Sequence, residues 1–235
     1  MWMKFSLTNQ KLNSLVPSTE ESASVIHIWG DVGVGKSTLC YGATLSTLAQ
    51  EKRVIFISTK SHFKTARFKQ MSKNYTQFNE YNFLLYTPTT FAQQAEIIMN
   101  LEFLILEEIR HLKKTSIGLI VLDSVSILWH LEMKSDALYQ NTLRALNTLI
   151  ATMDHIRRMY QIPILITNRS VIRTQNNRNF TQPASNAVME YWGKTKLKIE
   201  RVENPAIREI ILESHPTRQN LPESIFAELT DSGFS

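Results

Sequence analysis

The feature that most constrains this 235-residue chain is a glycine-rich stretch, residues 30–40, which reads GDVGVGKSTLC. It matches the pattern G-x-x-x-x-G-K-[ST]. In that pattern, glycines let backbone N–H groups converge on phosphate oxygens, the lysine reaches the β- and γ-phosphates, and the hydroxyl holds magnesium. Such a loop has to leave a strand and open a helix. An apolar, β-branched run precedes it at 24–29 and a helix-like segment follows from 36.

This context predicts a nucleoside-triphosphate site, with the positive amino end of the helix facing the phosphates. A glycine-rich turn without a ligand is the bland alternative, and the strand-to-helix context argues against it. The residues expected to bind the nucleotide are Gly30, Asp31, Val32, Gly33, Val34, Gly35, Lys36, Ser37 and Thr38.

Strand-like and helix-like segments alternate along the rest of the chain. Apolar runs predict strands at 53–59, 82–86, 118–123 and 163–167, and helical spacing predicts helices at about 90–113 and about 143–162. The last third holds short alternating segments typical of antiparallel strands. We therefore expect an α/β fold with a mostly parallel central sheet, flanking helices and antiparallel strands at the C-terminal end. Residues 24–235 are expected to form one core domain, preceded by a short extension, residues 1–23.

Composition narrows the class of partner. The net charge is +5, and residues 155–189 contain five arginines and no acidic residue, which favours an anionic partner. No apolar run is long enough to span a membrane and the first residues lack a signal-peptide core. We expect a soluble, intracellular protein. The single cysteine, Cys40, allows no intrachain disulfide and is expected to pack in a helix.

Asp123 ends the apolar run GLIVLD, residues 118–123. A carboxylate at the carboxyl end of a buried parallel strand lies where ligands of such sheets bind, so Asp123 is expected to hold Mg²⁺ through water while Ser37 binds it directly. The alternative is a helix-capping aspartate. Ser124 follows, at a position where many motor ATPases and helicases place the glutamate that activates water.

The order of motifs resembles the RecA-type recombinases, and within them the archaeal RadA branch and its short RadB paralogs. The resemblance spans about residues 24–234 and rests on six segments, GDVGVGKST, FISTKSHFKTARFKQ, GLIVLDSVSILW, IPILITNRS, PASNAVMEYW and HPTRQNLPESIFAELTDSGF. It implies a RecA-like P-loop NTPase core with ATP and Mg²⁺ as cofactors, and a role in homologous recombination and DNA repair. The partners that it implies are single-stranded DNA and a RadA-like recombinase or another paralog. The implied location is the cytoplasm, in association with the nucleoid, or the nucleus if the source is eukaryotic. Full-length RadA proteins carry an additional N-terminal domain and a polymerisation motif. Residues 1–23 are too short for both, which favours the paralog.

Compared with the family residue by residue, this sequence matches at one nucleotide-binding position and has a basic residue in place of the family's residue at two others. Arg67 matches the arginine that lies against adenine, although a solvated helix face is the alternative. Lys60 stands where the family has the glutamate that orients the attacking water. A lysine accepts no hydrogen bond, so we expect at most a weak DNA-dependent ATPase, with Lys60 neutralising phosphate charge or contacting a neighbouring subunit. Arg169 replaces the glutamine that senses the γ-phosphate.

Residues 170–182 correspond to the family's loop for single-stranded DNA. The segment is expected to be a polar, flexible loop in which Arg173 and Arg178 hold phosphates and Phe180 stacks on a base. A merely solvated surface loop is the alternative. The other DNA loop, residues 129–135, matches less clearly, and Trp129 there is equally consistent with the core.

Two other functions are also consistent with a P-loop in an α/β fold. A small-molecule P-loop kinase would transfer phosphate without DNA. A signalling ATPase of the circadian-clock type shares the expected fold and would bind no DNA through residues 170–182.

Overall fold

The structure is a computed structural model that describes residues 7, 9–16, 25–75, 78–113, 115–133, 136–175, 178–184 and 186–235. Its strands are β1 Ile26–Gly30, β2 Arg53–Ser58, β3 Phe83–Tyr86, β4 Ile117–Asp123, β5 Ile164–Gln175, β6 Arg178–Pro183, β7 Thr195–Arg201, β8 Ile207–Ser214, β9 Glu223–Thr230 and β10 Gly233–Phe234. Its α-helices are α1 Gln10–Leu15, α2 Lys36–Leu48, α3 Thr65–Ser72, α4 Phe91–Leu112, α5 Ser126–Glu132, α6 Asp136–Tyr160 and α7 Asn186–Trp192. A short 3₁₀ turn covers Glu80–Asn82.

The strands form one sheet in the order β10-β9-β8-β7-β1-β5-β4-β2-β3, with β6 paired to β5 alone. Every neighbouring pair from β3 to β7 is parallel, and the pairs from β7 to β10 are antiparallel. The predicted fold class, a mostly parallel sheet with antiparallel C-terminal strands, is confirmed. Because β1, β5, β4 and β2 are parallel, their carboxyl ends meet at one edge of the sheet.

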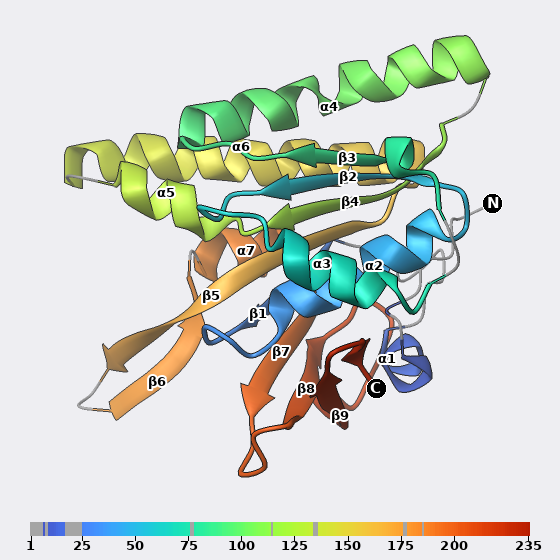
Figure 1. Cartoon of the computed structure of the whole chain (residues 1–235). Coiled ribbons are helices and arrows are strands. Elements are labelled where there is room, and N and C mark those ends of the chain that lie inside the picture. The colour runs from blue at the N-terminus through green and yellow to red at the C-terminus, as the bar shows by residue number, and fades with distance from the viewer. Residues whose placement is uncertain are drawn as a thin grey trace.

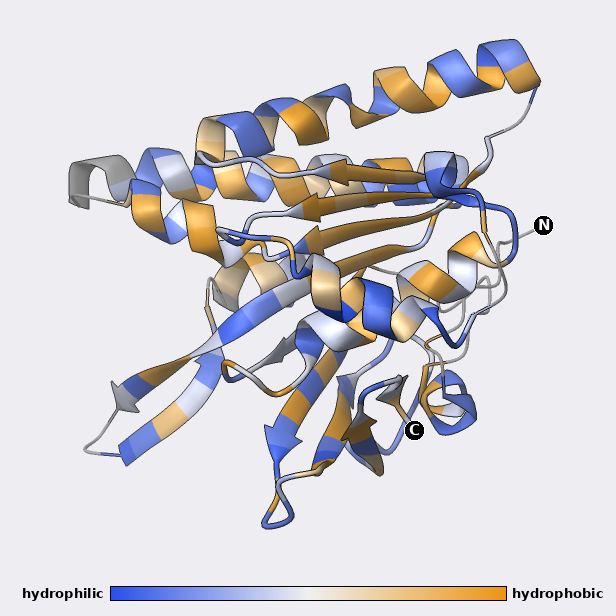
Figure 2. Ribbon diagram, viewed as in Figure 1, coloured by the Kyte–Doolittle hydropathy of each residue, from blue (hydrophilic) through white to orange (hydrophobic). Residues whose placement is uncertain are grey.

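The central strands are buried on both faces, and their residues alternate between two cores. On β2, Val54 and Phe56 join one hydrophobic cluster while Ile55 and Ile57 join the other. Helices α4 and α6 cover one face of the sheet, and α2 covers the other (Figure 1). The continuous apolar runs stand out in the middle of the sheet in Figure 2. Such runs are typical of parallel strands with helices on both sides.

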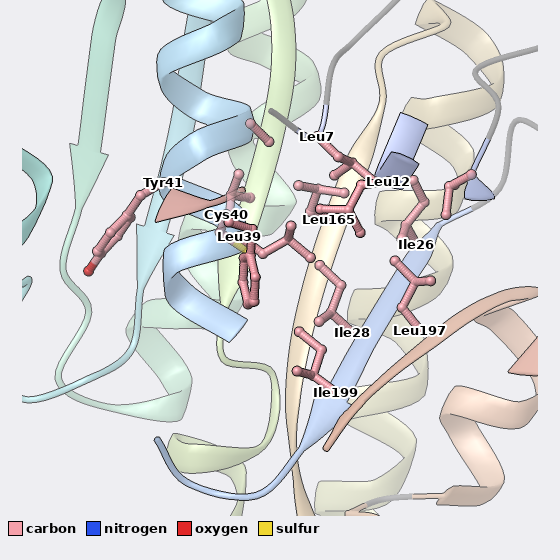
Figure 3. Packing of buried hydrophobic residues seen from close by; sticks show 14 of the residues in the cluster. Leu7, Leu12, Ile26, Ile28, Leu39, Cys40, Tyr41, Leu165, Leu197 and Ile199 are labelled. Atoms are coloured by element: carbon pink, nitrogen blue, oxygen red, sulfur yellow. The ribbon is translucent and has the colours of Figure 1, made fainter. Parts of the chain in front are cut away.

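Part of the expected N-terminal extension contributes to the core. Leu7 and Leu12 are buried in the cluster that also contains Ile26 and Leu197 (Figure 3). Leu15 belongs to the same cluster, and helix α1 contacts β9. Asn9 caps α1 by accepting a hydrogen bond from the backbone N–H of Lys11 at 2.7 Å. Residues 1–6, 8 and 17–24 lie outside the described residues, so the division at residue 24 stays a prediction.

The segment expected as a flexible loop, residues 170–182, is instead mostly β-structure. Strand β5 continues to Gln175 and pairs with β6 in an antiparallel ladder from Ser170–Pro183 to Gln175–Arg178. The β-branched and aromatic residues of this segment favour extended backbone, and cross-strand pairing satisfies its N–H and C=O groups. The two strands project from the body of the molecule (Figure 1). Residues 176 and 177, between them, lie outside the described residues.

Candidate functional site

The phosphate loop, residues 30–35, joins the end of β1 to the start of α2. Gly30 and Gly35 adopt φ angles of 145° and 107°. A Cβ at Gly30 would lie 2.2 Å from the carbonyl oxygen of Ile199, and one at Gly35 would lie 2.7 Å from the ring of Phe234. Both positions therefore require glycine. Of the other expected binding residues, Asp31, Val32 and Gly33 are exposed, Ser37 and Thr38 are half-buried, and Val34 is buried.

Lys36 is the first residue of α2, and its ammonium group folds back over the loop. The Nζ atom donates to the carbonyl oxygens of Gly30 at 2.7 Å and Asp31 at 2.6 Å. Burial, followed by the neighbouring Lys60 ammonium, lowers the pKa of Lys36 from 10.5 to about 8, although Asp123 opposes the shift. A buried cation beside the loop is what phosphate binding requires.

The two oxygen groups expected to hold Mg²⁺ converge on the ammonium group of a lysine. Asp123 ends β4 with 1% of its surface exposed, and its Oδ1 accepts a hydrogen bond from the Thr167 hydroxyl. Its Oδ2 lies 2.9 Å from Nζ of Lys60, and the same Nζ donates to the hydroxyl of Ser37. The cap residue of α5 is Val125, so Asp123 is not a helix cap. Ser37 and Asp123 thus come together as expected, with Lys60 between them.

Thr59 fixes the backbone from which Lys60 extends. Its N–H donates to the carbonyl oxygen of Asp123 at 2.9 Å. Its hydroxyl donates to the carbonyl oxygen of Ser124 at 2.6 Å and accepts from the N–H of the same residue at 2.8 Å. These three bonds join the carboxyl ends of β2 and β4, so Lys60 begins next to the buried carboxylate that it reaches.

Strand β5 supports the loop from the other side. Arg169, the sensor position, pairs with Gly30 in the parallel ladder, and its side chain is exposed beside the start of the loop. The Ser170 hydroxyl donates to the carboxylate of Asp31. Because the Thr167 hydroxyl donates to the β4 carboxylate, one strand contacts both the phosphate loop and the acidic position. A γ-phosphate contact by Arg169 stays a prediction.

Arg67, expected against adenine, holds the C-terminal end of the chain. Its Nη1 donates to the carbonyl oxygen of Asp231 at 3.0 Å, and its Nη2 donates to that of Thr230. Thr230 ends β9 and Asp231 begins the turn to β10, whose Phe234 packs beside Gly35. Arg67 and the last strand therefore flank the phosphate loop together. The adenine contact itself stays a prediction.

The three residues expected to bind DNA share one face of the ribbon formed by β5 and β6. Arg173 lies opposite Phe180 in the ladder, and opposite residues of an antiparallel pair project to the same face. Arg178 is two positions from Phe180 and so projects to that face as well. All three side chains are exposed, with 40% of Phe180 accessible. The ribbon therefore presents two guanidinium groups and an aromatic ring together.

The second expected DNA segment, residues 129–135, begins in the core. Trp129 is 2% exposed and its Nε1–H donates to the carbonyl oxygen of Thr142 at 3.1 Å, so it packs as a core residue. Burial lowers the pKa of the next residue, His130, to about 4, with further lowering by Arg169 and Arg173. The end of α5 is therefore within electrostatic range of these two β5 arginines. Residues 134 and 135 lie outside the described part of the chain.

Sequence patterns alone do not single out three side chains that contact the site: Thr167, Ser170 and Arg201. Arg201 ends β7, and its Nη2 donates to the carbonyl oxygen of Val32 at 2.6 Å. No local signal marks Arg201, because β7 reaches the loop only through the sheet order. Thr167 and Ser170 lie within two residues of the sensor position Arg169, and this proximity in the sequence is the feature that could have indicated their role.

Comparison with known proteins identifies the family. The sequence matches the family model described as Rad51 over residues 2–226. This chain belongs to the Rad51 family. One relative, the DNA repair and recombination protein RadB of Methanococcus maripaludis, is 31% identical over 206 residues, covering 87% of this chain and 88% of the relative. The RadB protein of Thermococcus kodakarensis is 25% identical over 236 residues, covering 97% of both chains.

Solved structures agree on the fold of this Rad51-family chain. A crystal structure of the RadB recombinase matches with a TM-score of 0.76 at 22% identity, covering 98% of both chains. The resemblance to RecA-type recombinases with RadB-like relatives is confirmed, and RecA-like recombinases in general bind ATP with Mg²⁺. Among the helices that the structure describes, none has the length and apolar character needed to cross a membrane.

Proposed function

We propose that this protein is an ATP-binding recombinase paralog that binds single-stranded DNA and assists homologous recombination and DNA repair as a mediator. Its partner is a RadA-like recombinase or another recombinase paralog. Relatives that cover most of the chain are named for DNA repair and recombination. The phosphate loop supports nucleotide binding through Gly30, Gly35 and Lys36.

The position of Lys60 is the observation that supports weak ATP hydrolysis. Its ammonium group donates to Ser37 and Asp123 at the point where a water-orienting carboxylate is expected. A protonated ammonium accepts no proton and no hydrogen bond, so it cannot activate water. The loss of such a group typically lowers the rate by about 10²–10⁴-fold. We therefore infer that ATP acts here mainly as a structural or switching ligand.

The ribbon of β5 and β6 supports the DNA contact. Arg173 and Arg178 share a face with Phe180, which suits a strand whose phosphates pair with guanidinium groups and whose bases stack. Strand β5 runs from this ribbon to Ser170 and Thr167, which contact the nucleotide site. A single strand thereby links the two proposed ligands. Membership in the Rad51 family favours this function over a small-molecule kinase or a clock-type ATPase.

Binding of a fluorescent oligo-dT to the purified protein, measured with and without ATP, tests the proposal. We expect binding that weakens steeply as salt rises from about 50 to about 200 mM, because counterions are released from the phosphates. ATP turnover should stay low with DNA in excess. In a strand-exchange assay, the protein should raise the yield of a RadA-like recombinase. Absence of DNA binding at low salt would refute the proposed DNA role, and rapid DNA-stimulated turnover would refute weak hydrolysis.

A further inference from the structure

The Lys60 ammonium group lies between the two oxygen groups that a magnesium ion would bridge. It donates to the Ser37 hydroxyl, and it lies 2.9 Å from Oδ2 of Asp123. An ammonium group has three N–H donors. Two of them serve these oxygens, and among the described residues no protein acceptor takes the third. That donor is available for a phosphate oxygen of a nucleotide held by the loop.

The position of Lys60 is built into the fold. Thr59 makes three hydrogen bonds to Asp123 and Ser124, and these bonds hold the backbone that precedes Lys60 against the end of β4. The Lys60 side chain is 31% exposed, whereas that of Asp123 is 1% exposed. The ammonium group therefore covers the buried carboxylate on the side that faces the phosphate loop.

This ammonium group and a magnesium ion would compete for the same oxygens. Mg²⁺ binds oxygen at about 2.0–2.1 Å in a nearly ideal octahedron, so its shell would have to include the Ser37 hydroxyl oxygen that now accepts from Lys60. It would also place a divalent charge next to a univalent one. The site places the two ammonium groups of Lys36 and Lys60 beside the single carboxylate of Asp123, so it offers positive charge to phosphate without any metal ion.

We propose that the Lys60 ammonium group takes the place of the divalent cation, so that this protein binds ATP without Mg²⁺. Lys36 and Lys60 together neutralise the β- and γ-phosphates. Ser37 and Asp123 orient Lys60 instead of binding metal. This inference rests on the nucleotide binding in the proposed function. It changes the expected role of Ser37 and Asp123 from binding metal to orienting Lys60.

Isothermal titration with ATP at neutral pH tests the inference, in one buffer with Mg²⁺ and in one with EDTA. For the wild type, the two dissociation constants should agree within about threefold, whereas a site that depends on the metal would lose more than about tenfold on chelation. Lys60→Met keeps an unbranched side chain without the charge. It should bind ATP at least about tenfold more weakly in EDTA, with partial recovery in Mg²⁺.

Lys69→Met is the matched control, because it removes the same charge from an exposed position on α3 and should behave as the wild type. If Lys60→Met does not fold, the wild-type comparison still decides, and Lys60→Gln is the second variant. Wild-type binding that requires Mg²⁺ would overturn the inference alone. Equal binding by Lys60→Met and wild type in EDTA would do the same. Absence of ATP binding in both buffers would overturn the proposed function as well.

Discussion

Replacing Arg173 and Arg178 by alanine tests whether the ribbon holds DNA through its phosphates. The two guanidinium groups are exposed on one face of β5 and β6, with Phe180 opposite Arg173 and two residues from Arg178. Neither arginine takes part in the ion pairs found among the described residues. Their removal should therefore change the charge of the ribbon and leave its backbone pairing intact.

The size of the effect follows from counterion release. For single strands, the slope of log K against log salt changes by about 0.7 for each phosphate contact, so the loss of two contacts makes the slope shallower by about 1.4. Raising the salt concentration from about 50 to about 200 mM should then weaken wild-type binding about sevenfold more than binding by the double variant. At low salt, the double variant should be the weaker binder.

Fluorescence anisotropy of a labelled oligo-dT across a salt series measures both slopes. The control is Arg110→Ala with Arg158→Ala, which removes the same charge from exposed positions near the C-terminal ends of α4 and α6. The ion pair of Arg110 is exposed and contributes little to stability. Asp154, the buried partner of Arg158, keeps its ion pair with Arg157 in the control. Equal slopes for the ribbon variant and the wild type would refute the assignment of DNA binding to the ribbon. If the control variant shows the same decrease in slope, the effect comes from net charge and not from contacts made by the ribbon.

Three further predictions concern the nucleotide site and its supporting strand. Because Lys36 has its pKa lowered to about 8 and binds phosphate as a cation, ATP affinity measured by titration calorimetry should fall as pH rises above that value. Lys60→Glu should raise DNA-stimulated ATP turnover by about 10²-fold or more in a phosphate-release assay. Burial, followed by Lys196, lowers the pKa of His27 from 6.5 to about 3. Folding stability should therefore be retained above pH 6.5 and lost as pH falls toward 3, by at most about 1.4 kcal/mol per pH unit. Denaturant titrations of wild type and His27→Leu would show whether this dependence disappears.

Elements with a strong local pattern were predictable from the sequence. Helix α4, expected at about 90–113, spans Phe91–Leu112. Thr90 caps it by accepting from the N–H of Gln93, whose side chain accepts from the N–H of Thr89. Strand β4 differs from its expected range by one residue. Such elements are set by hydrophobic period and by capping chemistry, both of which are written in neighbouring residues.

The arrangement of distant residues was not predictable in the same way. The ribbon residues 170–182 were expected to form a loop, because polar composition suggested flexibility and the cross-strand pairing had no local signal. Arg201 reaches Val32 only because β7 lies beside β1 in the sheet. The sequence identified Lys60 as a departure from the family pattern, but it did not show that its ammonium group contacts both Ser37 and Asp123.

The contact of Lys60 with Ser37 and Asp123 links two proposed properties, weak ATP hydrolysis and ATP binding without Mg²⁺, to one side chain. A lysine at position 60 removes the carboxylate that would orient water, and its ammonium group supplies positive charge where a metal ion would bind. Charge at the phosphates is needed to hold ATP, whereas a base is needed only to hydrolyse it. On the proposed function, Lys60 therefore favours ATP binding at the expense of turnover. Thr167 of β5 donates to the same carboxylate, so the strand that forms the ribbon also contacts the group that Lys60 reaches.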